Sequence, residues 1–306
     1  MTSSKPKIVR TVAELRKEIS SFRRSRPLED SAVGFVPTMG YLHEGHASLL
    51  RRSVQDNGLT VLSIFVNPIQ FGPNEDLDKY PRDEEKDVAL AAVCGVDLVF
   101  LPTVQEMYPQ RRVTTVTVAE VTDGLCGASR PGHFDGVATV VAKLLNIVQP
   151  DRAYFGLKDA QQVAVVTRMA QDLNIPTEIV PCPTVREEDG LALSSRNVYL
   201  NAEEREQALS LSHSLSRVAE WIGEGVDAPE LSELLKREIR RSPLARIEYA
   251  EALTYPDLLP PEPGTPLRSI DGSVLVALAV RFGTTRLIDN RLLNPKEVGV
   301  HACFAK

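Results

Sequence analysis

A strand pattern turns into a helix pattern at residues 37–46, which carry the run Pro37-Thr38-Met39-Gly40-Tyr41-Leu42-His43-Glu44-Gly45-His46. The apolar stretch Val33–Val36 precedes this run, and the helix-like stretch Ala47–Val54 follows it. The amino end of a helix offers free backbone N–H groups and about half a positive charge, and both attract phosphate. Imidazole rings at the same place add further donors, so the run predicts a protein that binds a nucleotide triphosphate.

Strand and helix patterns alternate along residues 1–184. Buried strands are expected at Val33–Val36, Leu59–Val66, Asp97–Leu101, Ala153–Phe155 and Thr177–Val180. Helices are expected at Glu44–Asn57, Asp83–Cys94, Gly136–Val148 and Asp159–Leu173. This alternation is typical of parallel strands joined by helical crossovers, so the predicted fold class is α/β with a doubly wound, Rossmann-like parallel sheet. Ligands of such sheets bind beyond the carboxyl ends of the strands.

Residues 185–306 follow a different pattern. Two helices are expected at Ala202–Ile222 and Pro229–Arg241, and strands at Ile247–Leu253, Ser273–Phe282 and Arg286–Asn290. Helices followed by an antiparallel meander predict a smaller α+β C-terminal domain, with the boundary near Pro183–Val185. The last stretch, 294–306, has no clear pattern and is expected to be mobile.

Composition limits the kinds of partner. The 306 residues suffice for about two domains. No apolar run approaches the roughly 20 residues that cross a bilayer, and the polar stretch Met1–Lys7 is unlike a signal peptide. The four cysteines are scattered without a CxxC pair, which argues against disulfides and for a cytoplasmic protein with reduced thiols. A net charge of −6 argues against a nucleic-acid binder. The expected partners are therefore small molecules.

The two histidines of the opening run are three residues apart, so on a helical turn they share a face. Phosphate binding is one interpretation, and a pair of surface histidines at a helix start is another. A zinc pair would need a third ligand, and the other three histidines have no paired spacing. Gly45 lies between the two and removes a side chain where a ligand would approach.

Three further loops carry polar groups suited to an anionic substrate. Gln70 lies in an amide-rich loop after the second strand. Lys158 follows another strand and precedes Asp159, a candidate helix cap. The run Ser194-Ser195-Arg196 follows an acidic loop at 187–190. Taken alone, each also fits an ordinary turn, a solvated lysine or a cap, but their coincidence on one sheet edge favours a phosphate site.

Six runs together resemble the pantothenate synthetases, which are pantoate–β-alanine ligases, over about residues 8–292. They are 37–46, Phe65-Val66-Asn67-Pro68-Ile69-Gln70-Phe71, Asp78-Lys79-Tyr80-Pro81-Arg82, Ser129-Arg130-Pro131-Gly132-His133-Phe134-Asp135-Gly136-Val137, Gly156-Leu157-Lys158-Asp159-Ala160-Gln161-Gln162 and Ser194-Ser195-Arg196-Asn197. The His-x-Gly-His element also resembles the HIGH signature of the wider nucleotidyltransferase and class I tRNA synthetase superfamily. The Ser-Ser-Arg segment resembles that superfamily's mobile KMSKS loop.

The resemblance implies a two-step, magnesium-dependent reaction in vitamin B5 and coenzyme A biosynthesis. ATP and pantoate give pantoyl-adenylate and pyrophosphate, and β-alanine then attacks the acyl carbon to give pantothenate and AMP. No organic prosthetic group is implied, and a homodimer is expected. Because the pantoate carboxylate is itself the nucleophile, the protein mainly positions the reactants and neutralises charge.

The resemblance also implies roles for individual residues. The implied catalytic residues around the phosphates are His43, His46, Lys158, Ser194, Ser195 and Arg196. The implied pantoate-binding residues are Pro37, Thr38, Met39, Gln70, Val141 and Gln162. The implied ATP-binding residues are Met39, Gly45, His46, Gly156, Leu157, Lys158, Asp159, Val185, Leu193, Ser194, Ser195 and Arg196. Arg130 and Tyr80 are expected near the site.

The chain departs from the family pattern at two places. Members often have adjacent acidic residues, linked to magnesium, where this chain has Lys86-Asp87. Asp87, helped by Glu85, is therefore the magnesium ligand predicted here. Leu193 replaces a frequent methionine and keeps the apolar volume, so the effect should be mild.

Two other functions compete with an adenylate-forming ligase. A nucleotidyltransferase of the same superfamily would act on another small acid or a phosphate, but a phosphate acceptor would require cations where Gln70 and Gln162 stand. A regulatory nucleotide-binding module is disfavoured because it has no need for the full set of basic phosphate ligands.

Overall fold

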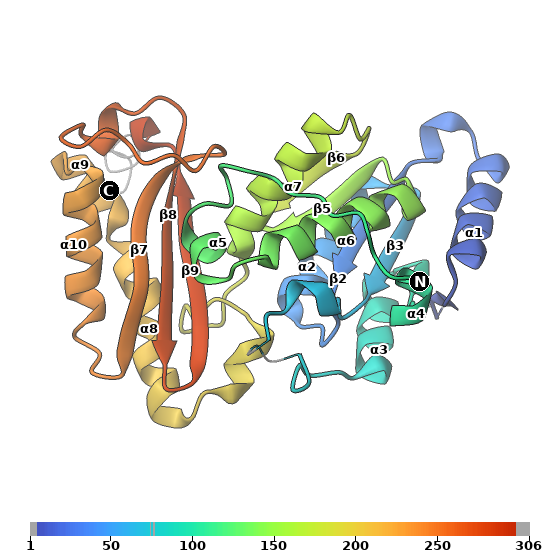
Figure 1. The fold of residues 1–306 in the computed structure, drawn as a ribbon, viewed down its shortest axis with the longest axis horizontal. Coiled ribbons are helices and arrows are strands. Elements are labelled where there is room, and N and C mark those ends of the chain that lie inside the picture. Colours follow the sequence, from blue (N-terminus) through green and yellow to red (C-terminus); the bar gives the residue numbers. More distant parts are fainter. Residues whose placement is uncertain (1–4, 74, 76, 298–306) are drawn as a thin grey trace, which may run out of the picture.

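A computed structural model of the chain describes residues 5–73, 75 and 77–297, which form two neighbouring β-sheets with their helices (Figure 1). The first sheet has six parallel strands in the order β1-β4-β3-β2-β5-β6. Along the chain these are β1 Lys7–Val9, β2 Val33–Thr38, β3 Leu59–Ile64, β4 Leu98–Phe100, β5 Arg152–Gly156 and β6 Glu178–Cys182. The predicted doubly wound α/β sheet is confirmed, and β1 is a strand that the sequence analysis did not predict.

The strand order places a topological switch point beside β2. From β2 the chain adds β3 and then β4 on one side, and it later adds β5 and β6 on the other side. β2 therefore pairs with β3 from Val33 to Thr38 and with β5 at Gly34 and Phe35. The crossovers leave β2 and β5 in opposite directions, and doubly wound sheets bind their ligands in the crevice beyond the carboxyl ends at such a point. The run at 37–46 and the run at 156–162 both begin there.

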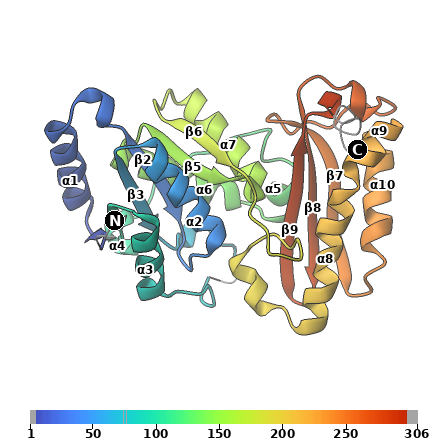
Figure 2. The same cartoon turned by 180° about the vertical axis from the view of Figure 1, so that it is seen from behind.

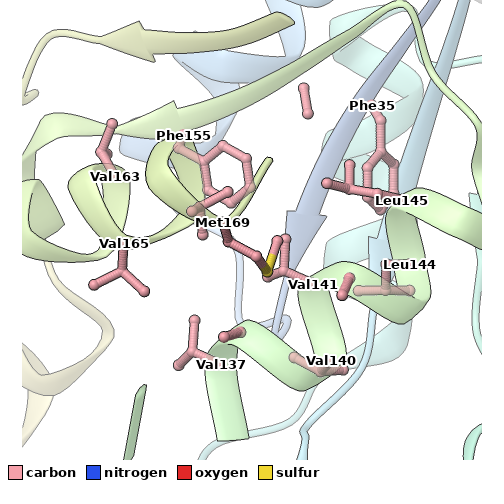
Figure 3. Close-up of a cluster of buried hydrophobic side chains, with 14 of the residues drawn as sticks. Phe35, Val137, Val140, Val141, Leu144, Leu145, Phe155, Val163, Val165 and Met169 are labelled. Carbon is pink, nitrogen blue, oxygen red and sulfur yellow. The ribbon is translucent and has the colours of Figure 1, made fainter. Parts of the chain in front are cut away.

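Helices cover both faces of the six-stranded sheet (Figure 2). One face carries α2 (Glu44–Asp56) and α3 (Glu84–Cys94), and alternate strand residues such as Val36 and Leu62 pack against them. The other face carries α1 (Val12–Ser25), α6 (His133–Val148) and α7 (Ala160–Asp172). Figure 3 shows Phe35 and Phe155 of the strands among Val141, Leu145 and Met169 of α6 and α7. This alternation fixes the register, because a slip of one residue would exchange the two faces.

The amino end of α6 packs against the loop that follows β3. That loop holds a short 3₁₀ turn at Pro68–Gln70, and a Cβ placed on Gly136 would lie 2.5 Å from Gln70 Cα and from the Ile69 carbonyl oxygen. Only glycine permits this approach of two backbones. Gly136 therefore determines how closely the Gln70 loop sits on the sheet.

The second sheet is antiparallel, in the order β7-β8-β9. Its strands are β7 Ala245–Tyr255, β8 Ser273–Phe282 and β9 Thr285–Leu293, and its helices are α8 Ala202–Ser216, α9 Val218–Glu224 and α10 Ala228–Ile239. Side chains of β8 alternate between two cores: Val274 and Val276 face the helices, while Leu275 and Ala277 join the core of the first sheet. The continuous apolar run of β8 is explained by burial on both faces.

The single helix predicted at Ala202–Ile222 is wrong, because two helices, α8 and α9, occupy this stretch and meet at Arg217. Arg291 of β9 donates hydrogen bonds from Nη1 to the carbonyl oxygens of Leu215 and Ser216, both at 3.0 Å. Those carbonyls would otherwise be among the partners of a continuing helix. A long-range contact thus ends α8, and it cannot be found from the local pattern.

Some elements lie outside the predictions made from sequence. Helix α1 was not predicted, although Thr11 and Glu14 form a capping box before its buried Leu15 and Ile19. The short helices α4 (Val104–Met107) and α5 (Leu125–Ser129) were also not predicted.

Of the expected mobile tail, residues 298–306 lie outside the described residues. Cys94, Cys126 and Cys182 are buried free thiols. In the described chain, every helix is too short or too polar to span a bilayer.

Substitution of Gly136 tests the close packing of α6 on the Gln70 loop. We expect Gly136→Ala to lower the free energy of unfolding by about 1–3 kcal/mol, since the new methyl group meets backbone atoms that cannot move freely. The control is Gly223→Ala in α9, where an added Cβ meets nothing within 4 Å. That change should raise the free energy of unfolding by about 0.4–1 kcal/mol. Urea denaturation measures both, and equal midpoints for Gly136→Ala and the wild type would contradict the packing argument.

Candidate active site

Four segments predicted to carry chemistry meet at the carboxyl edge of the first sheet. Three of them follow β2, β3 and β5 directly. The fourth, the loop with Ser194, comes from the chain after β6 and reaches the same place. A Cβ on Gly45 would lie 3.8 Å from Leu193 Cβ, and one small cavity is lined by both Lys158 and Ser194. The structure therefore brings together loops that lie far apart in the sequence.

His43 and His46 cap the amino end of α2 reciprocally. Nδ1 of His43 accepts the backbone N–H of Gly45 at 3.1 Å, and Nδ1 of His46 accepts the backbone N–H of His43 at 3.3 Å. The ring centroids are 4.1 Å apart. Since each Nδ1 is an acceptor, each neutral ring carries its proton on Nε2. The caps thus fix both tautomers and leave two Nε2–H donors for a ligand.

The environment keeps both imidazoles neutral. Loss of hydration, followed by the charge of Lys158, lowers the pKa of His43 to about 4. Loss of hydration, followed by the neighbouring His43 and then Lys158, lowers the pKa of His46 to about 3. Both values lie well below the ordinary histidine value near 6.5. At neutral pH these side chains therefore act as hydrogen-bond donors and not as cations.

Gly45 has a structural role that the sequence analysis did not foresee. A Cβ at this position would lie 2.8 Å from Cε1 of His43 and 2.9 Å from its Nδ1. The missing side chain thus makes room for the His43 ring itself, which folds back over the helix end. The predicted approach of a ligand to Gly45 stays a prediction.

Lys158 supplies positive charge next to the histidines. It lies in a 3₁₀ turn at Leu157–Asp159 between β5 and α7, and its Nζ is 3.5 Å from a carboxylate oxygen of Asp159. Desolvation by itself would raise the pKa of Asp159, but the charges of Lys158 and Arg196 outweigh it and lower that pKa. Asp159 thus stays ionised in the field of two cations from different loops. A phosphate entering this place would meet the positive charge of both Lys158 and Arg196.

Gln70 is held in one orientation by its neighbours. Its Oε1 accepts from Nδ2 of Asn67 at 3.1 Å, and its Nε2 is 3.2 Å from the sulfur of Met39. Asn67 is itself fixed, because its Oδ1 accepts the Tyr108 hydroxyl at 2.8 Å. Gln70 is 8% exposed and Asn67 is 1% exposed. Met39 and Gln70, both assigned to pantoate by the resemblance, are thus in direct contact.

Arg130 and Tyr80, expected near the site, adjoin the Gln70 loop. Arg130 forms a two-pronged ion pair with Glu75, with N–O distances of 2.7 and 2.6 Å. It also donates to Nε2 of His133, whose Nδ1 donates to the carbonyl oxygen of Gln70 at 2.8 Å. Tyr80 is 6% exposed and meets the Phe71 ring edge-on at 5.9 Å. Both residues support the loop that carries Gln70.

The segment with Ser194, Ser195 and Arg196 is held at both ends. A narrow hairpin precedes it, in which the N–H of Leu193 donates to the Val185 carbonyl at 3.0 Å. Arg205 of α8 binds Glu187 and Asp189 of the acidic loop at 2.7 and 2.6 Å. Beyond the segment, the Tyr199 hydroxyl donates to the Lys79 carbonyl at 3.1 Å. The loop thus reaches from the second sheet across to the segment after β3.

Asp87 is engaged in holding the loop after β2. It is 1% exposed, and its two oxygens accept the backbone N–H groups of Tyr41 and Leu42 at 2.8 and 2.6 Å. Burial raises its pKa, and those two bonds offset only part of the rise. Among residues 5–73, 75 and 77–297, no three His, Cys, Asp or Glu side chains gather as a metal site. Asp87, buried and with both oxygens on backbone N–H groups, therefore does not fit a magnesium ligand.

The other residues assigned by resemblance lie in or near the same region, and their roles stay predictions. Pro37 and Thr38 end β2, where the Thr38 hydroxyl donates to the Ser63 carbonyl at 2.8 Å. Val141 is 5% exposed within the core drawn in Figure 3. Gly156 ends β5, and Gln162 lies in the first turn of α7.

Three polar residues of the site were missed from the sequence. The sequence indicates no role for Asn67, yet its side chain holds Gln70. Asp289 and Asn290 are 2% and 9% exposed on β9, and the Asn290 side chain contacts the Lys158 turn. The signal for Asp289 and Asn290 was a pair of polar residues at the end of the predicted strand Arg286–Asn290. Buried polar groups need hydrogen-bond partners, so such a pair points to specific contacts.

Comparison with known proteins gives consistent matches over nearly the whole chain. Residues 7–292 match the sequence family described as Pantoate-beta-alanine ligase. A pantothenate synthetase of Caldicellulosiruptor saccharolyticus is 52% identical over 284 residues, which are 92% of this chain and 98% of that protein.

Solved structures agree with the sequence matches. The crystal structure of pantothenate synthetase from Thermus thermophilus superposes with a TM-score of 0.84 at 48% identity, covering 93% of this chain and 98% of that one. The pantoate-beta-alanine ligase from Francisella tularensis, complexed with beta-gamma ATP and beta-alanine, superposes with a TM-score of 0.73 at 33% identity. That match covers 95% of this chain and 99% of the other.

The lowered pKa values predict how the histidines titrate. The unfolded chain binds these protons near pH 6.5, whereas folded His43 and His46 bind them near pH 4 and 3. The unfolded state thus holds more protons as the pH falls from about 6.5 toward 4, and this pair lowers the free energy of unfolding over that window. NMR of ¹⁵N-labelled imidazoles should find both rings protonated on Nε2 and uncharged at pH 7. A midpoint near 6.5 for either ring would contradict this account.

Proposed function

The chain belongs to the pantoate-beta-alanine ligase family, and we propose that it condenses pantoate with β-alanine, converting one ATP to AMP and pyrophosphate. In the first step a pantoate carboxylate oxygen attacks the α-phosphorus. The bond from that phosphorus to the bridging oxygen breaks, and pyrophosphate leaves with the electron pair. The product bound at this stage is pantoyl-adenylate.

The observation that carries the proposal is the pair of Nε2–H donors on His43 and His46 next to the Lys158 ammonium. Adenylation moves negative charge onto the α-phosphate and the departing pyrophosphate. Neutral donors fixed in place stabilise such charge without rearranging during the reaction. Lys158 and Arg196 add full positive charges, and the hydroxyls of Ser194 and Ser195 add adaptable donors. A general base is unnecessary, because an ionised carboxylate attacks directly.

Pantoate would lie in the pocket beside Met39 and Gln70. The amide of Gln70 suits a hydroxyl or carboxylate group, and Gln162 offers a second amide from the first turn of α7. The apolar side chains of Met39 and Val141 suit the two methyl groups of pantoate, with Pro37 and Thr38 forming the floor at the end of β2. The adenosine part of ATP would lie along Gly45, Gly156, Leu157, Asp159, Val185 and Leu193.

In the second step the amine of β-alanine attacks the acyl carbon of the adenylate. The C–N bond forms, the bond from the acyl carbon to the phosphate oxygen breaks, and AMP leaves while the nitrogen loses a proton. Holding the adenylate in a closed site protects it from water, which would otherwise compete with the amine. The second unit, residues 185–306, carries the Ser194–Arg196 loop, which is suited to close over the site on the first, residues 1–184.

Magnesium belongs to this proposal as a companion of ATP. Mg²⁺ keeps several waters and is usually bound through substrate phosphates with one or two carboxylates. The buried Asp87, with both oxygens on backbone N–H groups, does not fit a ligand of that ion. The nucleotide phosphates are therefore its main ligands here.

A nucleotidyltransferase acting on another acid or on a phosphate is the second candidate. The amides of Gln70 and Gln162 argue against a phosphate acceptor, which would favour cations in their place. Reactants that are cytoplasmic metabolites, together with the buried free thiols of Cys94, Cys126 and Cys182, are consistent with a cytoplasmic enzyme.

The proposal includes a homodimer that forms through residues 110–119. Residues 113–118 are all valine or threonine, which favour strands, yet they form no strand within this chain. Val113 is 90% exposed, and a cavity of about 560 Å³ runs alongside, lined by Tyr108, Lys143 and others. An unpaired segment of this kind is suited to pair with its copy across a twofold axis.

Sedimentation equilibrium tests the dimer. The wild type should sediment at twice its 33.7 kDa, and Val113→Asp should shift it toward the monomer because the charge would be buried at the interface. Leu28→Asp is the matched control, since Leu28 is 92% exposed but belongs to the 3₁₀ turn after α1 and not to that segment. A monomeric wild type, or dissociation by both changes, would contradict the assignment.

The release of AMP and pyrophosphate tests the reaction itself. The purified chain with ATP and Mg²⁺ should release pyrophosphate only when pantoate is added, and it should form AMP and pantothenate only when β-alanine follows. The reason is that pantoate is the nucleophile of the first step and β-alanine that of the second. Release of AMP without pantoate, or the absence of product with both substrates present, would contradict the proposed ligase reaction.

A further inference from the structure

We infer that Asp289 and Asn290, neighbours on β9, are positioning residues that hold the Lys158 turn and the Ser194–Arg196 loop in register with each other. The inference rests on the proposed adenylation at this site and extends it to residues outside the substrate pocket. β9 is the edge strand of the second sheet and lies on its side toward α5 in both views (Figure 1, Figure 2).

Asn290 anchors the turn that carries Lys158. Its Nδ2 donates to the carbonyl oxygen of Leu157 at 2.8 Å and to that of Lys158 at 2.9 Å. Both amide hydrogens are thus used on consecutive carbonyls of one turn, which fixes the direction of that peptide plane. The Lys158 side chain leaves from the same backbone, so its ammonium group is aimed by a side chain of the second sheet.

Asp289 anchors the opposite loop. It is 2% exposed, and its carboxylate receives two hydrogen bonds from the Arg186 guanidinium at 2.7 and 2.8 Å. Arg186 also donates to the Gly190 carbonyl at 3.0 Å and faces Ala192 across the hairpin. That hairpin leads directly into Leu193 and Ser194. β9 therefore holds both the loop with Ser194 and the Lys158 turn.

The two anchors are coupled to each other. The backbone N–H of Asn290 donates to the Asp289 carboxylate at 2.7 Å. A shift of either residue would therefore disturb the contacts of the other. Burial of the Asp289 carboxylate costs desolvation free energy, and the geometry of its pairing with Arg186 must be accurate for that cost to be offset. Side chains mounted on a strand hold a site more accurately than side chains on loops. The pair thus acts as a rigid bridge between the two loops that carry the proposed catalytic groups.

Arg291 provides a matched control on the same strand. It too donates to two consecutive carbonyls, those of Leu215 and Ser216, both at 3.0 Å. These belong to the end of α8 and lie within the second unit. Loss of Arg291 therefore removes the same kind of contact from the next residue without touching either catalytic loop.

A double-mutant cycle on the first step tests the inference, with single-turnover release of pyrophosphate from ATP and pantoate as the readout. Lys158→Ala should slow that release by about 10²–10³-fold, and Asn290→Ala by about 10–100-fold through misplacement of the ammonium group. If Asn290 acts through Lys158, the double variant should be within about threefold of Lys158→Ala alone. Arg291→Ala should stay within about threefold of the wild type.

Other measurements keep the outcomes distinct. Asn290→Ala should leave the KM for pantoate and the reaction of supplied pantoyl-adenylate with β-alanine within about twofold of the wild type. If it does not fold, Asn290→Ser takes its place in the cycle. An Asn290 variant as fast as the wild type, effects that multiply in the double variant, or an equal loss in Arg291→Ala would overturn the inference. A wild type that releases no pyrophosphate with pantoate would refute the proposed function instead.

Discussion

The reciprocal capping of α2 by His43 and His46 is the constraint on which the site depends. A helix end at the switch point between β2 and β5 already favours an anion. Using each Nδ1 to satisfy a backbone N–H commits both protons to Nε2 and leaves two N–H donors for a ligand in the crevice. Gly45 is required because any side chain would meet the His43 ring. The fold thus converts a short stretch of sequence into two donors of fixed direction.

The charges are arranged around these neutral donors in a consistent order. Desolvation and the nearby Lys158 keep the histidines uncharged, so the cations at the site are Lys158 and Arg196, and both lower the pKa of Asp159. Such an arrangement needs no proton transfer from the protein in the first step. It also explains why loops from both sheets must meet. The donors follow β2, one cation follows β5, and the other lies in the loop after β6. β9 contacts the Lys158 turn and the hairpin that precedes Arg196.

The sequence predicts most of what is local and little of what is long-range. The apolar pattern of β8 and the strand-to-helix change at 37–46 were enough to place those elements, because burial on two faces and a helix start each leave a local pattern. The break at Arg217 was not predictable, since Arg291 binds the Leu215 carbonyl from 76 positions further along the chain. Asp87 likewise matched a family position, but only the structure places both its oxygens on the loop after β2. Asn290 binds backbone carbonyls of a distant turn, and such contacts leave no periodic pattern in the sequence.

The most direct test is a crystal structure of the intact chain with pantoate and an ATP analogue that cannot release pyrophosphate. The account predicts that Nε2 of His43, Nε2 of His46 and Nζ of Lys158 each lie about 3 Å from a phosphate oxygen. The pantoate carboxylate should face the α-phosphorus from the side of Gln70. Phosphates bound away from the crevice between β2 and β5, or imidazoles that present Nδ1 to them, would contradict it.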